Sequence, residues 1–68
     1  MNKYELLVTT VDGRCFVKVD NLPAIMKNAS EYTERLGADM VLMQVTNLQT
    51  GEVLAAWRYD PTYGLTAV

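Results

Sequence analysis

The chain has 68 residues, of which 50% are hydrophobic and 21% charged, as in one small globular domain. Six Lys and Arg stand against eight Asp and Glu, a net charge of −2, so the polybasic field that draws proteins onto nucleic acid or anionic membranes is missing. With no His and one Cys, imidazole and thiolate metal sites, Ser-His and Cys-His pairs and an internal disulfide are excluded. We expect a single domain over residues 1–68, with residues 60–68 as a C-terminal tail, no metal, no cofactor and no enzymatic activity.

Two strands are expected first, over residues 4–11 and 14–19, which are rich in Val, Leu, Thr and Phe. Asp12-Gly13 between them favours a two-residue hairpin turn, and such a turn fixes the register. The register predicts a core face made of Leu6, Val8, Thr10, Cys15, Val17 and Val19. Leu7 and Phe16 then belong to the opposite face.

A helix is expected next, beginning near Leu22 after a capping Asp20 or Asn21 and ending before Gly37. Its apolar residues recur at the i, i+3, i+4 spacing of one buried stripe, which consists of Leu22, Ile25, Met26, Ala29, Tyr32, Thr33 and Leu36. The other side carries charged residues and is expected to face solvent.

A second hairpin is expected from residues 40–46 and 53–59, with Gly51 in the left-handed position of the connecting loop. If the loop closes with Asn47 opposite Glu52, Leu42 faces Trp57, and Met40 faces Tyr59. The predicted fold class is α+β, a β-β-α-β-β domain in which one helix packs on one face of a four-stranded antiparallel sheet.

The expected core is formed by apolar residues of the helix and of the covered face: Val8, Val17, Ile25, Ala29, Leu36, Val41 and Val45. One helix covers one face only, so the other face should be polar in an isolated monomer. It is predicted to be apolar instead, which is typical of an interface formed by Leu7, Phe16, Met40, Leu42, Trp57 and Tyr59. Two alternatives stay open: the tail of residues 60–68 folds over this face, or the second hairpin has another register.

The remaining chemical inventory is sparse. The eight carboxylates are dispersed over turns and the helix, and the four glycines form no phosphate-binding loop. Cys15 is expected to pack in the core as a small apolar residue. These features favour no catalytic site.

A basic and aromatic strand supports an alternative function. Arg14, Phe16 and Lys18 alternate, so they project from one face in the manner of a single-stranded nucleic-acid platform. The net charge of −2 opposes phosphate binding. This nucleic-acid-binding module is the second hypothesis.

By elimination, the sequence predicts a protein-interaction module that acts as a regulator, inhibitor or adaptor, as a homodimer or on a host protein. Small proteins of this kind are frequent in phages and mobile elements. The longest apolar run, Val53 to Trp57, is far below the roughly 20 residues needed to cross a bilayer, and no signal peptide is visible. We therefore expect a cytoplasmic protein without membrane contact.

Overall fold

The chain folds into one antiparallel sheet with one α-helix on one side. The computed structural model describes residues 3–60 and 62–68. Its elements are β1 (Tyr4–Thr10), β2 (Cys15–Asp20), α1 (Leu22–Leu36), a 3₁₀ turn (Gly37–Asp39), β3 (Met40–Asn47), β4 (Val53–Asp60) and β5 (Gly64–Ala67). The strand order across the sheet is β2-β1-β3-β4-β5. The α+β class with an antiparallel sheet is confirmed, but the sheet has five strands and not four.

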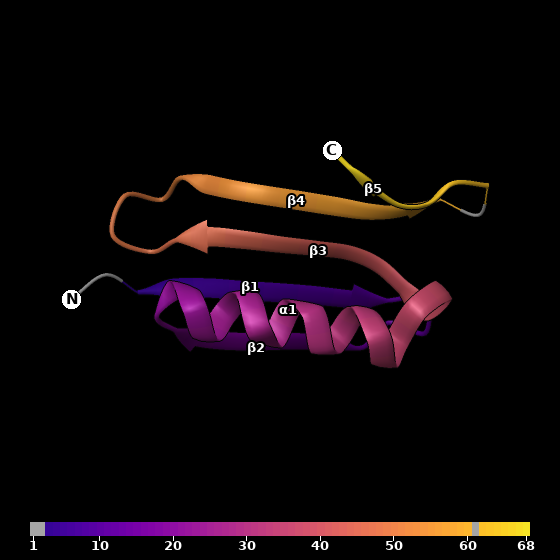
Figure 1. The fold of residues 1–68 in the computed structure, drawn as a ribbon, viewed down its shortest axis with the longest axis horizontal. Coiled ribbons are helices and arrows are strands. Elements are labelled where there is room, and N and C mark those ends of the chain that lie inside the picture. Colours follow the sequence, from indigo (N-terminus) through magenta and orange to yellow (C-terminus); the bar gives the residue numbers. More distant parts are fainter. Residues whose placement is uncertain (1–2, 61) are drawn as a thin grey trace.

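The helix covers only part of the sheet. Figure 1 shows α1 running along β1 and β2, while β4 and β5 lie to one side of it. The buried core lies between α1 and the strands β1 and β3, and it contains Leu6, Val8, Ile25, Ala29, Met40, Met43 and Val45. Of the core expected from the sequence, four residues are buried (Val8, Ile25, Ala29 and Val45), and Leu36 is half-buried. Val17 and Val41 are exposed, so their expected burial is wrong.

The helix begins and ends where its sequence predicts. The Asn21 side chain accepts a hydrogen bond from the Ala24 N–H at 3.0 Å, and proline follows in the first turn, where no N–H is required. Gly37 ends the helix with a φ of +49°, a conformation that glycine adopts without steric penalty. Ile25 and Ala29 are buried beneath the helix, whereas Met26, at the margin of the stripe, is exposed.

The first hairpin has a three-residue loop, one residue longer than predicted. The Thr10 N–H donates to the Arg14 carbonyl at 3.0 Å, and the Gly13 N–H donates to the Thr10 carbonyl at 3.1 Å. Gly13, with a φ of +84°, takes the left-handed position that ends such a loop. The pairs are therefore Val8 with Phe16 and Leu7 with Val17.

This one-residue shift turns β2 over, because side chains alternate along a strand. Phe16 moves to the α1 side, where it packs against the core. Cys15, Val17 and Val19 move to the opposite side, where all three are exposed. Their predicted place on the core face is wrong.

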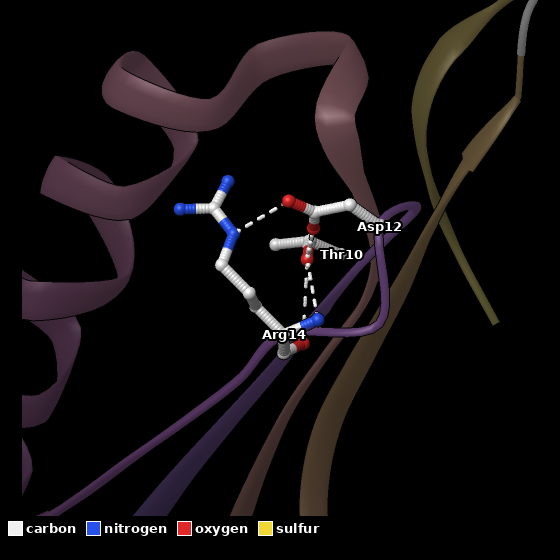
Figure 2. A network of polar contacts seen from close by, with 3 residues as sticks. All are labelled: Thr10, Asp12 and Arg14. Atoms are coloured by element: carbon white, nitrogen blue, oxygen red, sulfur yellow. Dashed lines mark hydrogen bonds and ion pairs between the residues drawn. The ribbon is translucent and has the colours of Figure 1, made fainter.

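Three side chains hold the longer loop together, as Figure 2 shows. The Thr10 hydroxyl donates to the Asp12 carboxylate and accepts the Arg14 backbone N–H at 3.0 Å. The Arg14 Nε–H donates to Asp12 Oδ2 at 2.8 Å. The Thr10 hydrogen bond has the largest effect on the pKa of Asp12 and lowers it; desolvation opposes this change, and the charge and hydrogen bonds of Arg14 lower the pKa further. The network stabilises the turn that sets the orientation of β2.

The second hairpin starts as predicted and then changes register. The Asn47 N–H donates to the Glu52 carbonyl at 2.8 Å, and Thr46 pairs with Val53. An irregularity between Val45 and Thr46 then shifts the pairing by one residue, as a β-bulge does. Beyond it, Met43 pairs with Trp57, and Leu42 pairs with Arg58. The predicted pairs Leu42 with Trp57 and Met40 with Tyr59 are wrong.

The fifth strand lies within the segment expected to be a tail. The Asp60 carboxylate accepts the N–H groups of Thr62 and Tyr63 at 2.7 and 3.2 Å, and the chain then turns back at Gly64. β5 pairs with the C-terminal half of β4, and Leu65 packs against the core. In the described part of this segment, residues 60 and 62–68, the chain therefore extends the sheet at its edge and does not cover the face opposite α1.

Candidate protein-interaction face

The six residues predicted to form an interface are divided between the two faces. Leu7 and Leu42 lie on the face opposite α1, as expected. The other four lie on the α1 side, namely Phe16, Met40, Trp57 and Tyr59. Met40 is fully buried, and Phe16 and Trp57 pack half-buried against the core. The six residues do not form one surface.

The basic and aromatic strand also differs from its prediction. Arg14, Phe16 and Lys18 still alternate, but they do so on the α1 side. The Phe16 ring centroid lies 5.4 Å from that of Tyr32 in α1, and the Arg14 guanidinium carbon lies 5.7 Å from the Phe16 centroid. Because Phe16 packs within the domain, it is not an outward platform on which a base could stack.

The face opposite α1 is the main uncovered surface, and we call it the open face. The α-helix of the described chain packs on the other side, and β5 continues the sheet. Strand pairing assigns the following residues to the open face: Cys15, Val17 and Val19 of β2; Glu5, Leu7 and Thr9 of β1; Leu42, Gln44 and Thr46 of β3; Val53, Ala56 and Arg58 of β4; and Thr66 of β5.

Apolar side chains are concentrated on the β2 and β1 half of the open face. Val17 lies directly opposite Leu7, and 53% of Val17 is exposed. Val19 is also exposed, and Leu42 follows one strand further on. The apolar area therefore lies toward the β2 edge of the open face, next to Glu5 on β1.

The charged groups of the open face are Glu5 and Arg58, which lie on β1 and β4. Within residues 3–60 and 62–68, the one ion pair is that of Arg14 with Asp12, so neither Glu5 nor Arg58 has an ionic partner there. Gln44 lies between them on β3, and its side-chain amide donates to the Thr46 hydroxyl at 3.4 Å, the long limit of a hydrogen bond. These three polar side chains retain hydrogen-bonding capacity toward a partner.

Other chemistry is limited among the described residues. They contain no group of three His, Cys, Asp or Glu residues that could hold a metal ion, and none of their helices is long and apolar enough to cross a membrane. A hollow beside β4 and β5 is lined by Arg58, Tyr59, Asp60, Thr66, Ala67 and Val68. Its charged side chains are one cation, Arg58, and one carboxylate, Asp60.

No protein-family model matches this chain, and neither a curated protein nor a solved structure matches it. The open face is therefore interpreted from its own geometry and chemistry.

Sequence reasoning missed Val17 and Val19 as surface residues. The signal that could have placed them was Gly13 as the last residue of a three-residue loop, a common alternative to the two-residue turn. With that loop, Val17 and Val19 fall on the same side as Leu7.

Proposed function

We propose that this chain is a non-enzymatic protein-interaction module, a regulator, inhibitor or adaptor, that binds its partner through the open face. The observation that carries the proposal is the apolar area that α1 leaves uncovered, where exposed Val17 and Val19 of β2 lie beside half-buried Leu7 of β1. The free energy falls when a second surface covers the apolar side of a sheet and removes it from water, and this decrease favours binding.

The size of the open face supports reversible binding. Its strands have four to eight residues and, at about 3.3 Å per residue and 4.8 Å between strands, five strands present roughly 400 to 500 Å² to a partner. A standard interface buries about 800 Å² on each side, and smaller ones belong to transient complexes.

The proposal retains Leu7 and Leu42 from the interface expected from the sequence and replaces the other four residues by Val17, Val19 and Ala56. A cytoplasmic site of action and an origin in a phage or mobile element are part of the same proposal, and the free thiol of Cys15 suits a reducing compartment. An enzymatic role has no support in the residue types of the face.

The decisive experiment compares two valine-to-lysine variants by affinity capture from the cells that naturally make the chain. Val17→Lys places a charge in the apolar area of the open face, whereas Val11→Lys places it in the hairpin loop, where 66% of Val11 is exposed. Both sites are open to solvent, so each variant should keep the circular dichroism of the wild type.

The captured partner should be lost with Val17→Lys and kept with Val11→Lys. Equal capture by both variants would exclude the open face as the binding surface. Binding that falls steeply as salt rises and that follows single-stranded nucleic acid would favour the basic strand instead.

A further inference from the structure

The two charges of the open face are symmetrically placed about Gln44. Glu5 lies on one neighbouring strand, opposite Thr46, which is two residues from Gln44 toward one end of β3. Arg58 lies on the other neighbouring strand, opposite Leu42, which is two residues from Gln44 toward the other end. Glu5 and Arg58 therefore have equal and opposite displacements from Gln44 within the sheet.

This symmetry has a consequence for two copies that meet face to face. Consider a two-fold axis that runs between the two sheets, over Gln44, at right angles to the line from Glu5 to Arg58. Such an axis brings Glu5 of each copy over Arg58 of the other, so one contact occurs twice, as in any isologous dimer. Opposite charges then meet at two positions with no like-charge contact between them.

We propose that the open face recognises a second copy of this chain in this two-fold arrangement. The inference rests on the proposed function, since it uses the same face, and it names the partner. The observations behind it are the reciprocal placement of two charges without ionic partners in the described structure, Glu5 and Arg58, and the apolar residues between them.

The same axis also gives suitable neighbours to Leu7, Leu42 and Gln44. With strands about 4.8 Å apart and alternate residues about 6.6 Å apart, Leu7 of one copy falls near Leu42 of the other. Gln44 meets its own copy, and a side-chain amide can both donate to and accept from an identical amide. The strands of the two sheets cross at about 70°, close to the orthogonal class of sheet packing.

Charge reversal distinguishes this arrangement from non-specific association of apolar surfaces. Glu5→Arg alone gives two Arg-Arg contacts, and Arg58→Glu alone gives two Glu-Glu contacts, so each single variant should dimerise about tenfold more weakly or worse. A chain with both changes restores two ion pairs and should dimerise like the wild type. An equimolar mixture of the two single variants should form a heterodimer, since each then supplies the charge that the other lacks.

Sedimentation equilibrium over concentrations up to about 1 mM measures these association constants. Glu34→Arg, on the exposed face of α1, is the matched control for charge reversal and should leave dimerisation unchanged. Circular dichroism of each variant establishes that the fold is retained.

Cys15 provides an independent geometric test, because the proposed axis passes close to it at the β2 edge of the face. It is the single cysteine of the chain and is exposed. A bismaleimide that spans the roughly 10 Å between packed sheets should link two wild-type chains through Cys15. The same reagent should give little dimer with Glu5→Arg, or with a Cys15→Ala chain that carries Tyr63→Cys in the distant β4–β5 turn.

The results separate this inference from the proposed function. A wild-type chain that stays monomeric at about 1 mM, or single variants that fail to combine on mixing, would overturn the two-fold dimer. If Val17→Lys still loses a captured partner, the interaction function stands with a different protein on the open face. If the wild type neither dimerises nor captures anything, both proposals fail.

Discussion

The two faces of the sheet carry similar residues that differ in their exposure to solvent. Val8 of β1 is fully buried beneath α1, whereas Val17 of the neighbouring strand β2 is 53% exposed on the open face. The residue type is the same, and the strands are adjacent. What differs is the side on which the register places each side chain, and one extra loop residue at the first hairpin decides it.

The largest loss of stability should be found at Ile25, in the helix that covers one face of the sheet. Ile25→Ala removes a fully buried side chain of α1 and should lower the free energy of unfolding by about 2 to 5 kcal/mol, much of the stability of a domain this small. The neighbouring Met26→Ala, at an exposed position, should change it by about 0.5 kcal/mol or less. Urea unfolding measures both, and equal losses would contradict the observed helix orientation.

Trp57 tests the region where the helix no longer covers the sheet. Its side chain packs half-buried against the core from β4, so Trp57→Ala should cost about 1 to 3 kcal/mol of unfolding free energy, less than a fully buried aromatic residue would. Thermal unfolding followed by circular dichroism provides the value. A loss of dimerisation without any loss of monomer stability would instead place Trp57 in an interface.

Phe16 and Val17 together test the orientation of β2. Phe16 packs against Tyr32 and the core, so Phe16→Ala should destabilise the monomer by about 1 to 2 kcal/mol. Val17→Ala, on the open face, should change stability by about 0.5 kcal/mol or less when the chain is dilute and monomeric. The reverse order would indicate the two-residue turn and a core-facing Val17.

The smallest effect concerns the loop that sets this orientation. The lowered pKa of Asp12 means that its contribution to stability is present above the unfolded-state pKa, close to 3.8, and is lost as the pH falls through the folded-state pKa. Asp12→Asn should therefore be less stable than the wild type at neutral pH, and the difference should shrink on acidification. Melting temperatures of both chains across this pH range give the comparison, and a gap that does not depend on pH would contradict it.

The sequence predicts the elements well because their signals are local. The Asn21 cap, the apolar spacing of α1, Gly37 and the loop at Gly51 each act within a few residues and appear as expected. The open face depends instead on register. A three-residue loop at Gly13 and a bulge next to Thr46 each shift a strand by one position, and both depend on contacts that no periodicity encodes.

Register also explains which part of the candidate site was predictable. Leu7 and Leu42 lie on β1 and β3 where their alternation alone places them, so they were assigned to the correct face. Phe16 follows the three-residue loop at Gly13, and Trp57 follows the bulge opposite Val45 and Thr46. Both residues were therefore assigned to the wrong face. Strand β5 was missed because its four residues are too few to show a pattern.

The short fifth strand has a practical consequence for fusions to this chain. The Val68 N–H donates to the Ala56 carbonyl at 2.9 Å, so β5 stops halfway along β4, and within the described residues Val53 to Ala55 have no neighbour on that edge. A peptide joined after Val68 would be directed along this free edge, where an extended segment rich in β-formers can add hydrogen bonds as a sixth strand. A glycine- and serine-rich spacer would avoid that pairing, whereas a deliberately chosen β-forming extension should raise the melting temperature of the domain.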